Sequence, residues 1–309
     1  MTSISFVDAD HLARLLPMEA AIDALETAFG SGSLPAAPLR AHVDTPWGTL
    51  ITMPVAGAQG AGVKVVTVTP SNPGRGRSLI QGLYVLFAPQ TQEPEAAIDG
   101  AALTAIRTGA VSGLATRHLA RPDAALLVVF GAGTQARSHL DAMRAVRPLE
   151  RVTVVSRTEA RAEDLAGAAR EMGLEATTGT PEAVAEADLV CTCTTSPTPV
   201  FDGTRLPEGV HVNAVGAYTP DARELDDETI RRGRVVVETR EVALAEAGDI
   251  LIAMRAGVVG EDHIVADLAE VVRGARVRRG PDDVTVFKSV GVAFEDLVVA
   301  RAAVDRLGS

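Results

Sequence analysis

The sequence lacks the features that mark membrane, secreted and nucleic-acid-binding proteins. No apolar run approaches about 18 residues and no signal-like apolar segment opens the chain, so we expect a cytoplasmic protein without a membrane span. Positive charge is in deficit, with 29 Lys and Arg against 40 Asp and Glu, and the formal net charge of -11 argues against a nucleic-acid or anionic-membrane partner. The 309 residues suit a globular protein of two domains.

Cysteine is almost absent, which excludes a disulfide framework. The only two, Cys191 and Cys193, lie in one apolar run at 188–193. They have no His and no further Cys nearby, so we expect buried free thiols and no metal site.

The most informative stretch is the apolar run Leu126–Phe130 followed by Gly131, Gly133 and Ala136. This pattern indicates a buried strand, a tight turn and a helix N-terminus, which is where a dinucleotide pyrophosphate binds. Gly131 would allow the turn, Gly133 would let the backbone approach the phosphates, and Ala136 would keep the helix close to the strand. The motif predicts a dinucleotide-binding fold.

A second strand at 152–155 ends at Ser156, Arg157 and Thr158, where the adenosine ribose would lie. A ribose 2′-hydroxyl is normally held by a carboxylate, and none occurs here before Glu159. An Arg and a hydroxyl suit a 2′-phosphate, so we expect NADP(H) rather than NAD(H). The alternatives are NAD(H), and an Arg157 that is only an exposed residue at a helix start.

The hydrophobic pattern changes along the chain and so predicts two domains. Helices at 8–16 and 17–29 precede antiparallel strands up to residue 98, whereas strands and helices alternate after Leu126. We assign residues 1–120 with 286–309 to an α+β domain for substrate binding and dimerisation, and 121–285 to a doubly wound, parallel Rossmann domain. The final apolar helix should return to the first domain. We expect no helical layer on the antiparallel sheet of that domain, so its apolar face predicts a homodimer.

The helix expected over 101–120 carries Thr104, Arg107 and Thr108 on one face. A cationic stripe on a buried-looking helix predicts a bound anion. Ligands of doubly wound sheets lie beyond the carboxyl ends of the strands, so Thr194, Val215 and Gly216 should line the cofactor cleft.

Six ordered motifs resemble the ornithine cyclodeaminase/μ-crystallin family over nearly the whole chain. They are Arg40 with 48–54, 62–65, 99–110, 131–135, 214–226 and 289–291. The resemblance implies a Rossmann domain, a second domain that dimerises through its sheet, and a nicotinamide cofactor acting at the carbon that bears an amino acid's nitrogen. The activities it implies are cyclising deamination of ornithine or lysine, alanine dehydrogenation and reduction of cyclic ketimines.

The resemblance also implies roles for individual residues. Arg40, Lys64 and Arg107 match positions that grip the substrate carboxylate. Lys288 and Ser289 match the region where the last strand approaches the nicotinamide. Cofactor-contact positions are matched by Thr108, Gly131, Gly133, Thr134, Gln135, Val215 and Gly216.

Two departures from the family's cyclodeaminases bear on the reaction. Thr52 and Tyr218 stand where those enzymes carry a Glu and an Asp. Without these acids the site suits reduction of an already formed imine, such as Δ1-pyrroline-2-carboxylate or Δ1-piperideine-2-carboxylate, to proline or pipecolate. Lys64 is the first candidate proton donor and Tyr218 the second, with Thr52 as a further hydroxyl. The alternatives are a cyclodeaminase or open-chain amino acid dehydrogenase, and a non-catalytic, crystallin-like protein that binds NADP.

Overall fold

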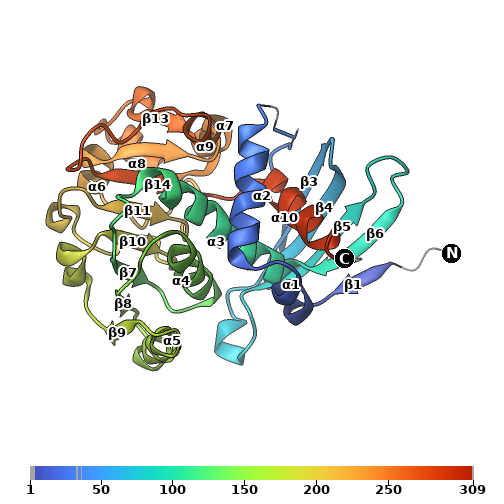
Figure 1. Cartoon of the computed structure of the whole chain (residues 1–309), viewed down its shortest axis with the longest axis horizontal. Helices are drawn as coiled ribbons and strands as arrows, with labels where there is room; N and C mark the ends of the chain where they lie inside the picture. The colour runs from blue at the N-terminus through green and yellow to red at the C-terminus, as the bar shows by residue number, and fades with distance from the viewer. Residues whose placement is uncertain (1–3, 33, 36, 308–309) are drawn as a thin grey trace. The chain divides into compact units, whose positions relative to one another are not determined.

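The computed structural model describes residues 4–32, 34–35 and 37–307, which form two compact units (Figure 1). One unit holds the described residues up to Arg107 and those from Val292 onward, and the other runs from Thr108 to Gly291. The division falls inside helix α3 (Gly100–Leu119), whereas the sequence pattern places the domain boundary at the end of this helix. Helix α3 therefore contributes residues to both units.

The first unit is built on a six-stranded sheet in the order β1-β6-β5-β4-β3-β2. Strands β2 to β6 form the expected antiparallel meander, while β1, which the sequence pattern did not reveal, pairs with β6 in parallel. The elements are β1 (Ser5–Val7), α1 (Ala9–Leu15), α2 (Met18–Gly30), β2 (Ala41–Thr45), β3 (Gly48–Gly57), β4 (Gly60–Val68), η1 (Pro73–Arg75), β5 (Ile80–Phe87) and β6 (Pro94–Asp99).

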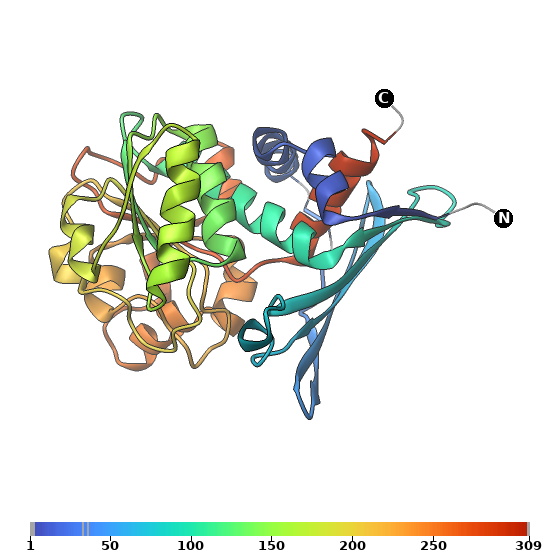
Figure 2. The same ribbon diagram turned by 90° about the horizontal axis from the view of Figure 1, so that it is seen from below.

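Helices cover one face of this sheet, so the expectation of a sheet without a helical layer was wrong. The final helix α10 (Ala293–Val304) returns to the first unit as expected and packs on β3, β4, β5 and α2 (Figure 2). Phe294 of α10 meets Phe29 of α2 edge to face, with ring centroids 4.9 Å apart. Nearly every residue of α10 is buried, because an apolar helix must be enclosed on most sides.

The opposite face of the sheet carries exposed apolar side chains, and we call it the uncovered face because no helix between residues 4 and 307, as far as the structure describes them, is seen to pack on it. Side chains alternate between faces along each strand, and pairing places Val43 beside Leu50, and Val65 between Thr52 and Leu83. Val43, Val65 and Leu83 are 56%, 37% and 44% exposed. An apolar sheet face of this kind is typical of a surface that is buried in an assembly.

The second unit contains an eight-stranded, all-parallel sheet in the order β13-β12-β14-β11-β10-β7-β8-β9. Strands β9, β8, β7, β10, β11 and β14 follow the doubly wound Rossmann order, whose direction reverses between β7 and β10. The strands are β7 (Leu126–Phe130), β8 (Arg151–Val155), β9 (Glu175–Thr178), β10 (Leu189–Thr192), β11 (His211–Ala214), β12 (Arg234–Val237), β13 (Ile264–Asp267) and β14 (Thr285–Lys288).

Several short helices of this unit escaped the sequence pattern although their caps are visible in it. Asp226 accepts a hydrogen bond from the Thr229 amide at the start of α6, and Asp267 and Glu270 form a capping box on α9. The helical segments are α4 (Thr134–Val146), α5 (Glu159–Glu171), η2 (Pro181–Glu186), η3 (Gly203–Arg205), α6 (Asp227–Arg232), α7 (Arg240–Glu246), α8 (Gly248–Arg255), η4 (Glu261–His263) and α9 (Leu268–Val272).

The core of the second unit is aliphatic and contains Cys191, whereas Cys193 is partly exposed. Val128, Val190 and Val212 of adjacent strands are all buried. Cys191 and Cys193 are free thiols, as expected, and burial raises the pKa of Cys191 to about 12, which keeps this thiol protonated. Among the described residues, no helix is long and apolar enough to cross a membrane.

Candidate active site

The glycine turn after β7 has the geometry that a dinucleotide requires. Gly131 has φ +100°, and a Cβ atom there would lie 2.6 Å from the carbonyl oxygen of Cys193, so only glycine fits. Gly133 is the N-cap of α4, which lacks a side-chain cap, and a Cβ on Gly133 would meet nothing within 4 Å. The amides at Thr134 and Gln135 therefore begin a helix whose N-terminus has room for phosphate groups.

Helix α3 packs tightly beside α4 at the position of Thr108. A Cβ on the next residue, Gly109, would lie 2.3 Å from Ser138 Oγ of α4, and Ser112 Oγ lies 2.9 Å from His139 Nε2. Thr108 is 6% exposed. Its predicted cofactor contact belongs to the same unit as the glycine turn.

The ribose end of the predicted cofactor site lies just beyond β8. Arg157 is exposed and has no ion-pair partner among the described residues. Ser156 Oγ accepts a hydrogen bond of 3.3 Å from the Thr158 amide, and Thr158 is the N-cap of α5. This edge has a hydroxyl and a guanidinium available for the ribose or its phosphate.

A buried carboxylate, Glu224, ties together the ends of β10 and β11. It accepts hydrogen bonds from Thr192 Oγ1 at 2.9 Å, from Thr194 N and Oγ1 at 2.7 and 2.6 Å, and from Gly216 N at 2.7 Å. Burial raises the pKa of Glu224, and the hydrogen bonds from Thr194 oppose this shift. Val215 lies between these contacts, with its amide 3.1 Å from the Thr192 carbonyl. Glu224 thus fixes the loops in which Thr194, Val215 and Gly216 lie.

Lys288 and Ser289 are buried and engaged within the second unit. The Lys288 ammonium lies 2.8 Å from Asp249 Oδ2 and donates a 2.5 Å hydrogen bond to the Ala217 carbonyl. Ser289 Oγ donates to Glu238 at 2.7 Å. Asp249 also accepts from the amides of residues 224 and 225, so Lys288 and Glu224 belong to one buried network.

The first unit brings two predicted cations together with two acids. Lys64 on β4 lies 2.9 and 3.0 Å from the two carboxylate oxygens of Asp296. Arg107 on α3 lies 3.1 Å from Glu295 Oε2 and, through Nε, 3.4 Å from Asp296 Oδ1. All four side chains are at least 93% buried. We call Lys64, Arg107, Glu295 and Asp296 the charged cluster.

The two acids were not among the predicted site residues, although the sequence contains a signal for them. Glu295 and Asp296 are adjacent acids in a helix whose only other charged residue is Arg301, and an unpaired charge in such a buried helix is costly. Lys64 carries the opposite charge on β4. Burial lowers the pKa of its ammonium to about 8; Asp296 opposes the shift, whereas Arg107 and Arg40 add to it.

Arg40 lies close enough to the charged cluster to affect Lys64. Its side chain is partly exposed, and its positive charge, like that of Arg107, lowers the pKa of Lys64. The structure therefore brings Arg40, Lys64 and Arg107, the three cations predicted to hold the substrate carboxylate, within electrostatic range of one another.

Thr52 lies on the other face of the sheet from Lys64, so β3 and β4 do not bring these two predicted residues together. Strand pairing sets Met53 opposite Lys64, so the buried Ile51 and Met53 share the Lys64 face and Thr52 points to the other face of the sheet. The period of two residues along a strand decides this, and the Lys64 face has no carboxylate on β3. Tyr218 belongs to the second unit, where it packs partly buried against the core.

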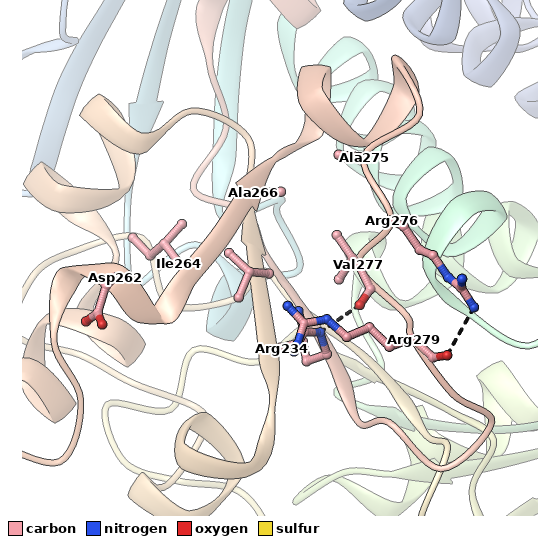
Figure 3. Close-up of a pocket in the computed structure, with 9 residues that line it drawn as sticks. Arg234, Asp262, Ile264, Ala266, Ala275, Arg276, Val277 and Arg279 are labelled. Atoms are coloured by element: carbon pink, nitrogen blue, oxygen red, sulfur yellow. Dashed lines mark hydrogen bonds between the residues drawn. The ribbon is translucent and has the colours of Figure 1, made fainter.

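A separate cavity of about 320 Å³ lies at the β12–β13 edge of the second unit (Figure 3). It contains none of the predicted site residues. The guanidinium groups of Arg234 and Arg276 donate to the backbone carbonyls of Val277 and Arg279, at 2.6 and 3.1 Å. Its lining is Arg234, Asp262, Ile264, Val265, Ala266, Ala275, Arg276, Val277 and Arg279.

Known proteins resemble this chain over nearly its whole length. A Δ1-pyrroline-2-carboxylate reductase of Bacillus cereus is 41% identical over 265 residues, which is 84% of this chain and 81% of that protein. The structure of the Thermococcus litoralis Δ1-pyrroline-2-carboxylate reductase with NADH and L-proline superposes with a TM-score of 0.94 at 36% identity, covering 98% of this chain and 97% of the other. An archaeal alanine dehydrogenase dimer with bound NAD has a TM-score of 0.92 at 31% identity, covering 98% and 95%.

The family profile agrees with these individual similarities. It describes the ornithine cyclodeaminase/mu-crystallin family and matches residues 5–309. The fold, the glycine turn and the motifs quoted from the sequence are consistent with that match. The chain belongs to the ornithine cyclodeaminase/mu-crystallin family.

Proposed function

We propose that this protein is an NAD(P)H-dependent reductase of cyclic α-imino acids that converts Δ1-pyrroline-2-carboxylate to L-proline. Δ1-Piperideine-2-carboxylate, which would yield L-pipecolate, is the second candidate substrate. The observation that carries the proposal is the buried pair Lys64 and Arg107, in a chain that also has the glycine turn of a dinucleotide-binding fold. The similarity to two reductases of this name, one of them with NADH and L-proline bound, supports it.

The residues of the first unit would bind and orient the substrate. Arg107 and Arg40 would hold its carboxylate through charge-assisted hydrogen bonds, each contributing roughly 1.5–3 kcal/mol. Lys64 would deliver a proton to the imine nitrogen, since its pKa of about 8 keeps it mostly protonated at neutral pH. The bound nicotinamide would supply the hydride to the imine carbon.

The side chains on β3 favour reduction over cyclising deamination. A deaminating enzyme must take protons from an amino group, and Ile51 and Thr52 cannot accept them. Tyr218 carries a phenol where the cyclodeaminases of the family carry a carboxylate. Glu295 and Asp296 are acids, but both are already paired with Arg107 or Lys64.

We further propose that NADP(H) is the preferred cofactor and that the protein is a homodimer joined through the uncovered face of its six-stranded sheet. The exposed Arg157 supports the first point, although the two solved relatives described above hold NADH and NAD. The exposed Val43, Val65 and Leu83 support the second, and the archaeal alanine dehydrogenase is a dimer.

A panel of reactions tests the proposed function. The purified protein is assayed with five- and six-membered cyclic imino acids, and with pyruvate plus ammonia, using NADPH or NADH. It is assayed in parallel with ornithine and either oxidised cofactor across pH 6–10, following ammonia and proline. We expect imine reduction, fastest at neutral or mildly acidic pH where more of the C=N is protonated. Catalytic proline formation from ornithine would restore the cyclodeaminase, and no turnover would favour a non-catalytic NADP-binding protein.

A further inference from the structure

Lysine is the rarest charged residue of this chain, and both of its copies are buried. The 29 basic residues include only two lysines, Lys64 and Lys288. They are 2% and 1% exposed, and each ammonium is paired with one aspartate, Asp296 and Asp249. All the remaining Lys and Arg positions are arginine, so lysine occurs in this chain only where its ammonium pairs with a buried aspartate. Arginine remains protonated in proteins, whereas a buried lysine can release its proton.

The geometry around Lys64 makes Asp296 its dominant partner. Both Asp296 oxygens lie within 3.0 Å of the ammonium, and the same carboxylate lies 3.4 Å from Arg107 Nε. Glu295, the residue before Asp296 on α10, forms its ion pair with Arg107 instead. On β5, Tyr84 pairs with Lys64 across the strands; its buried hydroxyl has no hydrogen-bond partner among the described residues.

We propose that Asp296 is a positioning residue that orients Lys64 and keeps it protonated as the proton donor to the imine. This inference rests on the proposed function. The imine nitrogen takes the proton from Lys64 Nζ onto its lone pair, and a reduced nicotinamide delivers hydride to the carbon. The C=N π pair then becomes the nitrogen lone pair of the amine, the nicotinamide is oxidised, and neutral Lys64 regains a proton from water.

The surrounding groups explain why this carboxylate is required. Burial and two neighbouring guanidinium groups, Arg107 and Arg40, all favour a neutral Lys64 amine, and Asp296 is the group that opposes them. Glu295 reaches Arg107 rather than Lys64, and the Tyr84 phenol is neutral because burial raises its pKa. Removal of the Asp296 charge should therefore release the Lys64 proton at a lower pH.

The two-lysine composition allows a direct test that does not depend on turnover. Protein labelled with [13C]lysine should give two side-chain Cε signals, and Lys64→Met assigns them. We expect the Lys64 signal to titrate near pH 8 in the wild type and at least one pH unit lower in Asp296→Asn. Glu295→Gln, which removes the neighbouring acid of α10, should leave the Lys64 titration within about half a unit of the wild type. The Lys288 signal, which comes from the second unit, reports whether each variant is folded.

Kinetics supply the second readout. In Asp296→Asn the alkaline limb of kcat/KM for imine reduction should move to lower pH by the same amount, with activity partly restored near pH 6. Asp296→Glu, which keeps the carboxylate, should return the alkaline limb to the wild-type pH. Ionisation of the substrate affects all variants equally, so a difference between variants reports on the protein. A uniform loss of activity with unchanged Lys64 titration would overturn the inference and leave Asp296 as a folding residue.

The titration also covers the remaining outcomes. If Asp296→Asn does not fold, the wild type still tests the inference, because a Lys64 that is already neutral at pH 7 would overturn it. A shifted titration in a protein that reduces no imine would instead contradict the proposed function and leave the pairing of Asp296 with Lys64 intact.

Discussion

At the scale of single residues, the proposed binding of substrate and cofactor depends on a few charged side chains. In the first unit, Lys64 and Arg107 are the buried cations proposed to hold the substrate carboxylate. The ribose edge of the second unit offers Arg157.

Arg107→Met should lower kcat/KM for a carboxylate-bearing imine by roughly a hundredfold, about 3 kcal/mol, because a bidentate fork and its charge are lost together. Cofactor affinity should be nearly unchanged, since the glycine turn belongs to the second unit. Steady-state kinetics and cofactor titration by nicotinamide fluorescence measure both. Arg107→Lys keeps the positive charge but loses the two-pronged guanidinium geometry, so its kcat/KM should lie between those of the wild type and Arg107→Met. Unchanged kinetics in Arg107→Met would show that this residue only supports the fold.

Arg157→Ala should raise the KM for NADPH by at least tenfold over that for NADH, which corresponds to a lost charge-assisted contact of roughly 1.5–3 kcal/mol. The comparison is made in initial-rate assays with both cofactors. Arg161→Ala, another exposed arginine just inside α5, is the matched control and should leave the ratio unchanged. Equal use of NADPH and NADH by the native protein would contradict the assignment.

At the scale of elements, hydrogen bonds join the strand ends that are predicted to line the cofactor cleft. Glu224 accepts four hydrogen bonds from residues at the ends of β10 and β11, so its buried carboxylate holds the two loops together. A carboxamide would present N–H groups where donors already point, and the loops would have to separate.

Glu224→Gln should therefore raise the cofactor Kd at least tenfold. This loss of affinity should be larger than the fraction of unfolded protein at the assay temperature can explain. Isothermal titration calorimetry and thermal unfolding with and without cofactor separate the two effects. The control is Glu228→Gln, which alters an exposed pair with Arg231 on α6 and should leave the Kd unchanged. A lower Tm with an unaltered Kd would mean that Glu224 stabilises the fold without shaping the site.

Many of the helices and strands could be predicted from the sequence, and the failure to predict the others has physical causes. The glycine turn, the meander and the final helix follow from local periodicity and backbone requirements, and the structure confirms them. Strand β1 and helices α6 to α9 are too short to show a period. Thr52 was predicted to be a site residue from its place in a motif, whereas the pleat of β3 places its side chain on the face of the sheet opposite Lys64.

At the scale of the whole molecule, the uncovered sheet face predicts a homodimer. Leu83→Arg places a charge amid Val65 and its neighbours and should give a monomer at micromolar concentration, because burying an unpaired charge costs several kcal/mol. Light scattering coupled to size exclusion measures the mass. Leu244→Arg, at a similarly exposed leucine of α7 in the second unit, should remain dimeric. A monomeric native protein would refute the prediction.

What local chemistry specifies is the dinucleotide fold and the family motifs, because a strand, a positive-φ glycine and a helix start are consecutive in the chain. What only the tertiary structure decides is which acids pair with the buried cations Lys64 and Arg107. Lys64 and Asp296 are separated by 232 residues, and Arg107 and Glu295 by 188. No periodicity connects such distant positions. The packing of α10 against β4 places two acids beside the buried cations, since uncompensated charges could not remain there.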